Sequence, residues 1–589
     1  MKHWWLLLLC CIPSLLLAQL KPSGYFRYPL DSVQQYISLF NALRDNHFHS
    51  GLDLKTQEKE GLPVLASADG YVSRIKVQSI GYGKAIYLDH PNGYTTVYGH
   101  LQAYQGAIAE WVYNNQYQLQ QFEFDHVFNK PLFKVKKGDT IAWSGNSGRS
   151  SGPHVHFEIR NTKTEHPVNP LLYGFGLLDT LAPQLHQLHF YIKRNHELLL
   201  AKSVNINPLK ISQQPGTNAL RYEDTIALPF SDFGIGFEAY DYLTDTTRKY
   251  MLYGADVAVN TLVNNRQTPL SAYRYQMTEA SFENKRVINR FIDYKTYEQT
   301  NKRIQLGFLI PGADFPFFVQ HHNKGWVKAD SNALLHAQLQ FFQFNAADSL
   351  QTSAKTAGVH SPTHLSIAVV IQCGSDSSFV EPLPTYCPYL ITPSTLTAQT
   401  EHAKVEFTPE SLFDTLSLCL SEIPTLRNAY SPLISVHHPE TPVREAYTLM
   451  CKPGGFAAKH RNQLCWVKGE KGYQKSSWKG DYLACTPSTF GVFKVVADTV
   501  KPRITTNSFK KGKLVSTNLV FYITDNLSGI KSYKGTIDNQ WELFEYDAKN
   551  DVLCFLQTEK LAPGKHQVKI VVMDDVGNTT TYQKTFTKN

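Results

Sequence analysis

The sequence predicts a mainly β protein that contains several modules. Short segments rich in Tyr, Phe, Thr and Val are separated by Gly and Asn-Gly turns, a pattern typical of antiparallel strands. Stretches with helical periodicity are scarce. The 589 residues are too many for one hydrophobic core, and the apolar content of 42% is that of ordinary globular proteins. We therefore expect an N-terminal antiparallel-sheet domain followed by several β-sandwich, immunoglobulin-like modules.

The first 18 residues have the features of a signal peptide. Met1-Lys2-His3 is a short basic start, residues 4–17 are apolar, and Ala18 supplies a small residue before the cleavage point. The apolar run is too short for a stable membrane span, and no later segment approaches that length. We expect an exported protein located in the periplasm or associated with the cell envelope, without a stable membrane span in its mature form.

The net charge of +8 is small for a chain of this length. It is compatible with simple solubility and also with a weak attraction to the anionic polymers of a cell envelope. No segment concentrates Lys and Arg, so we expect no nucleic-acid partner.

Residues 19–178 are predicted to form the first domain. Hairpin-type turns such as Asn92-Gly93 separate short strands, which indicates an antiparallel sheet. The predicted strands are 71–77, 84–90, 94–101, 140–143 and 154–160. Residues 107–117 carry Ile108, Trp111 and Val112 at helical spacing and are expected to form a short amphipathic helix.

A short motif that occurs twice in the sequence predicts where further modules begin. Asp179-Thr-Leu-Ala-Pro183 and Asp498-Thr-Val-Lys-Pro502 share the pattern D-T-x-x-P, and each opens a new β-patterned region. We expect a β-rich module at 179–355, a cysteine-containing β module at 356–497 and an immunoglobulin-like module at 498–589. The Gly577-Asn578 ending of the last region resembles the immunoglobulin-like modules of secreted proteins.

The cysteines are concentrated in the second half of the chain. Of nine cysteines, Cys10 and Cys11 would leave with the signal peptide, and six of the remaining seven lie between Cys373 and Cys485. In an oxidising compartment this block could form up to three disulfides, whose connectivity the sequence does not reveal. No CxxC pair occurs, which argues against a zinc site made of cysteines.

A candidate metal site emerges from two alternating segments. In the segment around His154 and His156, residues two apart point to the same face of a strand, together with Glu158 and Arg160. His49 and Asp53 share a face in the same way. Three such ligands and one open position are what a catalytic zinc ion requires.

Each of these signals also has a simpler interpretation. An HxH pair can be a surface pair, and an HxxxD step is weaker still. His100, which should lie on one side of its strand together with Tyr98, can be a hydrogen-bonded structural histidine. The combination of these signals in one domain, each opposite an apolar face, favours the metal site.

Five segments resemble the lysostaphin-type zinc endopeptidases, which cut the stem peptides or crossbridges of peptidoglycan. The resemblance covers residues 40–172, and its motif blocks follow the family's order. The segments are His49-Ser-Gly-Leu-Asp53, Gly61-Leu-Pro-Val-Leu-Ala66, Gly81-Tyr-Gly83, Tyr98-Gly-His-Leu101 and Gly145-Asn-Ser-Gly-Arg-Ser-Ser-Gly-Pro-His-Val-His-Phe-Glu158.

The resemblance implies one Zn²⁺ per chain, bound by His49, Asp53 and His156. It further implies that His154 is the general base acting on a zinc-bound water and that His100 helps to polarise that water and stabilise the oxyanion. The expected function is that of a secreted zinc-dependent endopeptidase acting on peptidoglycan. The alternatives are a catalytically inactive envelope scaffold that regulates another wall hydrolase, and a protease that acts on secreted proteins.

The chain departs from the family's pattern after Leu101. An insertion at about 103–134, rich in Tyr, Gln and Phe, stands where the family usually has a short turn. It is either a surface decoration or a lid that restricts the substrate. The C-terminal β modules are expected to bind the wall, to contact an envelope protein partner, or to act as spacers.

Overall fold

The computed structural model describes residues 24–588, apart from 32–34, 46, 176–180, 195–196, 214–219, 244–245, 264–265, 280–285, 314, 316, 344–363, 376–386 and 426–429. The expected signal peptide and the first D-T-x-x-P motif at Asp179 therefore lie wholly or partly outside the described residues. Within the described ranges, no helix is both long enough and apolar enough to cross a membrane.

The N-terminal unit contains one large and one small antiparallel sheet. The large sheet has the strand order β1-β2-β11-β6-β5-β4-β8, with β12 beside β11 and β9 beside β4. Its strands are β1 (Tyr36–Ser38), β2 (Leu52–Lys55), β4 (Gly70–Val77), β5 (Lys84–Asp89), β6 (Tyr94–Leu101), β8 (Phe124–Val127), β9 (Lys134–Val135), β11 (His154–Asn161) and β12 (Pro167–Val168). The small sheet has the order β3-β10-β7 and consists of β3 (Pro63–Leu65), β10 (Thr140–Trp143) and β7 (Ala103–Tyr104).

The alternation of the sequence accounts for the core of this unit. Leu52 and Leu54 of β2 and Val155, Phe157 and Ile159 of β11 are all buried in one hydrophobic cluster. Side chains at the intervening positions therefore point to the opposite face of the sheet. The expected helix is also present, as α1 (Gly106–Leu119), and the 3-10 helix η1 (Pro170–Tyr173) closes the unit.

The second unit contains two sheets around its own core. One consists of β13 (Gln184–Arg194), β14 (Glu197–Asn205), β17 (Asp232–Tyr240), β20 (Gln305–Leu306) and β22 (Trp326–Lys328). The other consists of β15 (Ile211–Gln213), β16 (Leu220–Ala227), β18 (Gly254–Val263), β19 (Arg266–Gln276), β21 (Phe318–His322), β23 (Leu334–Phe342) and β24 (His364–Gln372). The connections include α2 (Ile288–Phe291), α3 (Tyr294–Thr300), η2 (Pro208–Lys210) and η3 (Asn323–Gly325).

Strand β24 lies beyond residue 355, where we expected this module to end. It pairs with β23 over its whole length, from Leu334 opposite Gln372 to Phe342 opposite His364. The division of the chain into domains remains a proposal, and this pairing favours a boundary after residue 372.

The third unit also has two main sheets and a small two-stranded sheet. The pair is β25 (Tyr389–Ile391) with β28 (Leu416–Leu418). The first main sheet consists of β26 (Thr397–Gln399), β27 (Ala403–Glu406), β31 (Thr448–Cys451), β35 (Tyr482–Cys485) and β34 (Ser476–Lys479). The second consists of β29 (Leu420–Ile423), β30 (Leu433–Val436), β36 (Gly491–Ala497), β32 (Leu464–Lys468) and β33 (Gly472–Gln474), and η5 (Gly455–Gln463) precedes β32.

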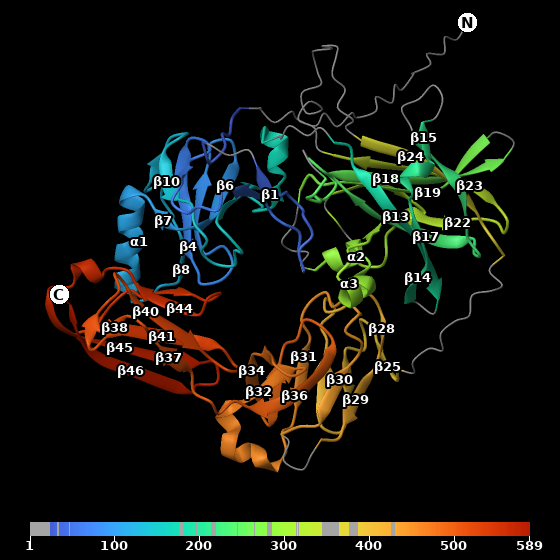
Figure 1. The fold of residues 1–589 in the computed structure, drawn as a ribbon. Coiled ribbons are helices and arrows are strands. Elements are labelled where there is room, and N and C mark those ends of the chain that lie inside the picture. The colour runs from blue at the N-terminus through green and yellow to red at the C-terminus, as the bar shows by residue number, and fades with distance from the viewer. Residues whose placement is uncertain are drawn as a thin grey trace, which may run out of the picture.

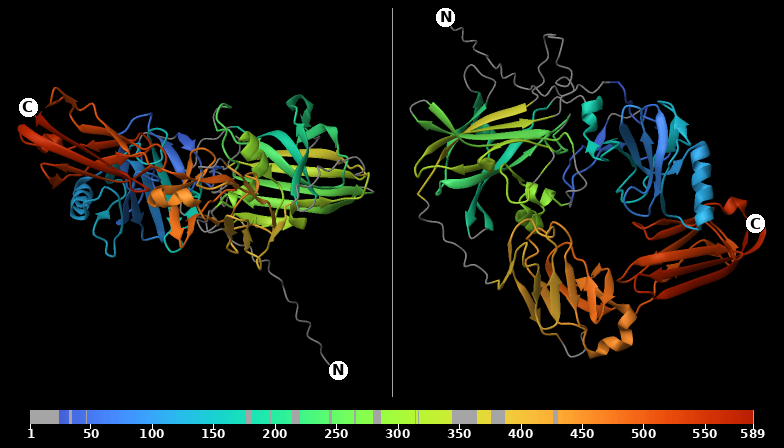
Figure 2. Two further views of the ribbon diagram at one scale, coloured as in Figure 1. Left: turned by 90° about the horizontal axis from the view of Figure 1, so that it is seen from below. Right: turned by 180° about the vertical axis from the view of Figure 1, so that it is seen from behind.

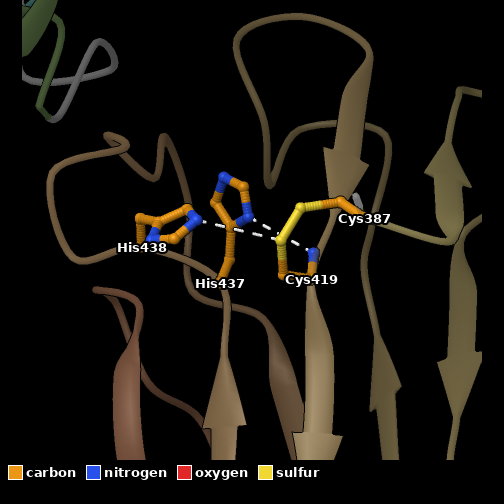
Figure 3. Close-up of side chains that lie close together, drawn as sticks. All are labelled: Cys387, Cys419, His437 and His438. Atoms are coloured by element: carbon orange, nitrogen blue, oxygen red, sulfur yellow. Dashed lines mark hydrogen bonds between the residues drawn. A yellow bond between two sulfur atoms is a disulfide. The ribbon is translucent and has the colours of Figure 1, made fainter. Parts of the chain in front are cut away.

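One disulfide, rather than three, forms in the cysteine block. It joins Cys387 to Cys419, beside His437 and His438 (Figure 3). The other four cysteines of the block are buried thiols, because they occupy apolar positions in or next to core strands; they are Cys373, Cys451, Cys465 and Cys485. Both sulfur atoms near the histidines belong to the disulfide, so neither is a thiolate ligand.

Loss of this disulfide should destabilise the third unit. The bond spans 32 residues, and closing a loop of that length stabilises a fold by about 3–4 kcal/mol through the entropy of the unfolded chain. We expect Cys419→Ser to lower the urea midpoint of the corresponding transition, and reduction of the wild-type protein to have the same effect. Cys554→Ser, which removes a half-buried free thiol, is the control; an unchanged midpoint in Cys419→Ser would contradict the prediction.

The C-terminal unit contains two sheets around a fourth core. One consists of β37 (Arg503–Thr505), β40 (Leu519–Thr524), β44 (Val552–Phe555) and β43 (Glu545–Asp547). The other consists of β38 (Phe509–Lys510), β39 (Lys513–Leu514), β46 (Thr579–Lys588), β45 (Gly564–Asp574), β41 (Ile530–Ile537) and β42 (Gln540–Trp541), and η6 (Thr558–Lys560) follows β44. The immunoglobulin-like assignment of this unit remains a prediction.

The four units follow one another around a ring, which the C-terminal unit closes by lying against α1 (Figure 1). Seen from its edge, the ring is much thinner than it is wide (Figure 2). Tyr117 of α1 donates a hydrogen bond to Glu542 at 2.6 Å, and Lys84 of β5 forms an ion pair with Glu545 at 2.8 Å. Leu543 is buried in the core cluster of the N-terminal unit. The insertion thus provides a surface on which the C-terminal unit docks.

Candidate metal centre

The pairing of three strands brings the predicted site residues together. Strand β11 lies between β2 and β6, with His156 opposite Asp53 on one side and opposite Gly99 on the other. Because Phe157 and its alternating neighbours fill the core, the histidines of β11 point away from it. The side chain of His156 therefore lies beside that of Asp53.

His49 reaches the same point from the loop before β2. The preceding residue, Phe48, lies among Phe291 and Phe317 of the second unit, with ring centroids 5.6 and 5.3 Å away. The amide of Asn41 donates to the carbonyl of His49 and the amide of His49 donates to the carbonyl of Ala42, which holds the other side of the loop. The second unit thus helps to position a residue of the site.

Three potential ligand atoms converge at this point. Nε2 of His49 lies 3.0 Å from Oδ1 of Asp53 and 3.1 Å from Nδ1 of His156, and the last two atoms are 2.9 Å apart. Ligands around a tetrahedral zinc ion lie roughly 3.3 Å from one another, given bond lengths of about 2.0–2.1 Å. All three side chains are buried. The three atoms would therefore need to move apart by only about 0.2–0.4 Å to surround a zinc ion.

In both His49 and His156, a hydrogen bond from one ring nitrogen determines that the other nitrogen faces the centre. Nδ1 of His49 donates to the carbonyl of Leu39 at 2.8 Å, and Nε2 of His156 donates to Glu158 at 2.8 Å. The opposite nitrogens, which carry the lone pairs, face each other across the centre. Two lone pairs at this distance repel unless a cation or a proton lies between them, so the donor set fits a metal ion.

His154 and His100 face the same centre without joining the triangle of atoms. Nδ1 of His154 donates to the carbonyl of Gly152 at 2.8 Å, and its Nε2 lies 3.6 Å from Oδ1 of Asp53. Nδ1 of His100 donates to the carbonyl of Ser147 at 2.9 Å. The two rings lie 4.7 Å apart. In both, Nε2 remains available to a substrate.

The expectation that Tyr98 and His100 share one side of their strand was wrong. Tyr98 is fully buried in the core, where its hydroxyl accepts a hydrogen bond from the amide of Ser67. His100 has a φ of 59°, and the pairing of β5 with β6 is irregular next to it. This left-handed residue interrupts the alternation and turns the imidazole toward His156.

Glu158 anchors the far side of His156. It is completely buried and accepts hydrogen bonds from Arg160 at 2.5 Å, Tyr82 at 2.6 Å and Ser50 at 2.5 Å. Burial raises the pKa of the Glu158 carboxyl, but the charge of Arg160 and the hydrogen bond from His156 outweigh it and lower that pKa. Glu158 is therefore an anion that holds the His156 ring in a single orientation.

The surroundings also set the charge of the other groups. Burial, together with the neighbouring histidines, lowers the pKa of His100 to about 3, so this imidazole is neutral. Burial raises the pKa of Asp53, but the charge of His49 and hydrogen bonds from three histidines outweigh it, and the pKa lies well below its usual value. Burial lowers the pKa of His156, but its hydrogen bonds with Asp53 and Glu158 outweigh this effect and raise that pKa to about 9. A metal ion would therefore take the place of a proton on Nδ1 of His156, while Asp53 offers a carboxylate and His49 a neutral imidazole.

The sequence contains a signal for some of the supporting residues and none for others. Glu158 and Arg160 follow from the alternation of β11. Arg44, which donates to Oδ2 of Asp53 at 2.9 Å, and Tyr82 lie in loops without periodicity. His47 is exposed, and His90 is hydrogen-bonded to Asp69 and Thr96 outside the site, as a structural histidine would be.

Comparison with known proteins places this site in a family. The family model described as "Peptidase family M23" matches residues 47–117 and 112–170. Residues 47–170 form an M23 peptidase domain. The two matched segments meet within α1, which belongs to the insertion. M23 peptidases depend on zinc, and in this M23 domain His49, Asp53 and His156 form a site that could hold it.

Curated relatives match the same part of the chain. An uncharacterized metalloprotease of Haemophilus influenzae is 33% identical over 162 residues, which are 26% of this chain and 28% of that protein. The DD-carboxypeptidase/endopeptidase Mpg of Neisseria meningitidis is 31% identical over 150 residues, 26% of this chain and 25% of that protein. The chain thus spans about a quarter of the length of these relatives.

Among solved structures, a zinc-containing peptidase from Vibrio cholerae is 28% identical over 25% of this chain and 39% of that chain, with a TM-score of 0.19.

Proposed function

We propose that this chain is a secreted, zinc-dependent endopeptidase that hydrolyses peptide crosslinks or stem peptides of peptidoglycan. The observation that carries the proposal is the convergence of three ligand atoms of His49, Asp53 and His156 within 3.1 Å of one another. The activity of the Neisseria relative, a DD-carboxypeptidase/endopeptidase, supports the peptidase class.

The proposed ligands are His49, Asp53 and His156, with one Zn²⁺ per chain. When bound, zinc would supply Lewis acidity toward the amide carbonyl and lower the pKa of water toward neutrality. Asp53 contributes a single negative charge, so the centre would keep a net positive charge and remain electrophilic. Arg44 holds the second carboxylate oxygen of Asp53 and leaves Oδ1 directed at the centre.

His154 is proposed as the general base. Its Nδ1–H is fixed by the carbonyl of Gly152, so Nε2 carries the lone pair and can accept a proton from the attacking water and return it to the leaving amine. His100 is neutral for the reasons given above and is fixed in the same way by Ser147. It is proposed to orient the water and to stabilise the developing oxyanion.

The insertion at 103–134 was expected to be either a decoration or a lid. Among the described residues, no hydrogen bond, ion pair or ring contact joins it to the five histidine and aspartate residues of the site. Its helix instead contacts the C-terminal unit through Tyr113 and Tyr117. These contacts favour a docking role, and substrate restriction by the insertion stays a hypothesis.

Digestion of purified peptidoglycan sacculi tests the proposal. The full chain should release soluble muropeptides, a chelator should abolish the release, and stoichiometric zinc should restore it. Asp53→Ala should be inactive with or without zinc. Mass spectrometry of the products identifies the bond that is cut.

Three outcomes would contradict the proposal. Equal release with the wild-type chain, the chelated chain and Asp53→Ala would exclude a metal-dependent activity. Zinc binding without any release from sacculi, but with cleavage of a secreted protein substrate, would favour the protease alternative. Zinc binding without cleavage of either substrate would favour the envelope scaffold that regulates another hydrolase.

A further inference from the structure

A second group of potential metal ligands lies far from the M23 domain, at the end of the C-terminal unit that meets the third unit. Asp498 directly follows β36, Asp525 directly follows β40, and Asp574 ends β45. One carboxylate oxygen from each lies within 4.8 Å of the others. Two oxygens bound on opposite sides of one Ca²⁺ ion lie at most roughly 4.8–5.2 Å apart, given bond lengths of about 2.4–2.6 Å.

The three carboxylates carry no compensating positive charge. Asp498 and Asp574 are only 1% and 0% exposed, and none of the three forms an ion pair within the described part of the chain. Their hydrogen-bond donors are neutral amides, such as that of Ser528 to Asp498 and that of Asn578 to Asp574. Two buried carboxylates and a half-buried third, all of the same charge and without a cation, are strongly unfavourable.

Two further oxygen atoms next to this cluster have no partner. Oδ1 of Asp525 is buried and accepts no hydrogen bond, whereas its Oδ2 accepts two from backbone amides. Ser528 is 6% exposed, lies against Asp498 through its amide, and has an unpartnered Oγ. Buried oxygens rarely lack a hydrogen-bond partner. A cation bound beside these two atoms would satisfy them, because both can act as oxygen ligands.

We propose that Asp498, Asp525 and Asp574 bind one Ca²⁺ ion, with Ser528 Oγ as an additional ligand. A set made only of carboxylate and hydroxyl oxygens selects a hard cation rather than zinc, which prefers nitrogen and sulfur. Mg²⁺ retains several water molecules, for which two fully buried carboxylates leave little room, whereas Ca²⁺ accepts many protein oxygens in an adaptable geometry.

The position of the site gives the ion a structural role. The amide of Asp498 donates to the carbonyl of Gln463 in the third unit at 2.9 Å. The side chain of Gln463 in turn donates to Asn578 at 2.7 Å, and Asn578 donates to Asp574 at 2.8 Å. The ion would therefore fix the junction between the third and the C-terminal units, and with it the C-terminal unit's place on the M23 domain.

A shared proton is the competing explanation. Burial and the negative charges of Asp498 and Asp525 raise the pKa of Asp574, so a proton could replace the cation as the neutralising charge. In that case stability would respond to pH and not to calcium.

Calcium titration of the full-length, metal-depleted chain distinguishes the two explanations. We expect one Ca²⁺ bound per chain by calorimetry, an increase of several degrees in the melting temperature, and slower hydrogen exchange at residues 498–502 and 525–529. MgCl₂ should have a weaker effect. The Asp53→Ala variant should bind calcium as the wild type does, which separates this site from the zinc site and from the proposed function.

Asparagine substitutions locate the site. Asp574→Asn and Asp525→Asn should abolish calcium binding, and both should be more stable than the wild type without calcium because one of three repelling charges is removed. Asp525 is partly exposed, so its variant decides the question if Asp574→Asn does not fold. Asp551→Asn makes the same charge change at an exposed position of this unit and should bind normally.

The proposal is overturned if the wild-type chain neither binds calcium nor gains stability from it. It is equally overturned if Asp525→Asn retains the binding.

Discussion

Replacement of His154 by alanine should lower kcat/KM on crosslinked peptidoglycan by about 10²–10⁴-fold and leave one zinc ion bound per chain. The imidazole is not among the three atoms that converge within 3.1 Å, so the metal site should persist without it. Its loss removes the Nε2 atom, 3.6 Å from Oδ1 of Asp53, that accepts the proton in the proposed mechanism. Release of soluble muropeptides gives the rate, and atomic absorption gives the zinc content.

Two variants bracket this result. Asp53→Ala should lose both zinc and activity, because a ligand is removed. His126→Ala, in β8 of the same domain and outside the site, should keep both. If His154→Ala loses its zinc, the residue is a ligand and the assignment of roles is wrong; if it keeps full activity, His154 is not the base.

Replacement of Glu158 by glutamine should have the second-largest effect. The buried carboxylate accepts hydrogen bonds from His156, Arg160 and Tyr82, and its loss removes the Glu158–Arg160 ion pair. Breaking a buried ion pair from one side costs about 3–5 kcal/mol of folding stability. Removing the group that orients a metal-binding histidine typically weakens metal affinity by about 10–100-fold. Urea unfolding and competition with a chromophoric zinc chelator measure the two effects.

A second substitution separates the two effects of Glu158→Gln. Adding Arg160→Met removes the other member of the ion pair and should recover much of the stability, but it cannot restore the carboxylate that orients His156. Zinc affinity should therefore remain low in the double variant. Glu165→Gln, an exposed carboxylate on the same hairpin, should change stability by less than about 0.5 kcal/mol. Full recovery of zinc affinity in the double variant would exclude the orienting role.

Alternation was enough to predict much of the metal centre. Residues 154–160 were identified as a strand, in which side chains alternate with a period of two. This predicted that Val155 and Phe157 lie in the core. It also predicted that His154, His156 and Glu158 share the opposite face. The same reasoning placed Asp53 opposite the apolar Leu52 and Leu54. The ligand roles came from the resemblance to the lysostaphin-type enzymes and remain proposals.

Alternation fails where the backbone leaves the regular strand conformation. Tyr98 and His100 are two residues apart, yet one lies in the core and the other at the metal centre. The positive φ of His100 is responsible. Glycine is the residue that usually indicates such a conformation in a sequence, and this position is a histidine, so the sequence did not predict it.

The number and pairing of the disulfides were also beyond the sequence. Counting cysteines set an upper limit of three, but the bond requires a specific separation of the two Cα atoms, and that separation is a property of the folded chain. Among the described cysteines, Cys387 and Cys419 are bonded and the others are free thiols. The rest serve as small apolar side chains in the third unit and its neighbours.

The sequence by itself determined the β architecture, the faces of the individual strands and the set of residues from which the metal centre is built. These features are local, because they depend on periodicity and on turn residues a few positions apart. Only the tertiary structure decided which neighbouring groups hold the histidines, that Phe48 packs the His49 loop against the second unit, and that the C-terminal unit docks on α1. The last two contacts join residues hundreds of positions apart, and their energy depends on shape and burial that exist only once the units have packed together.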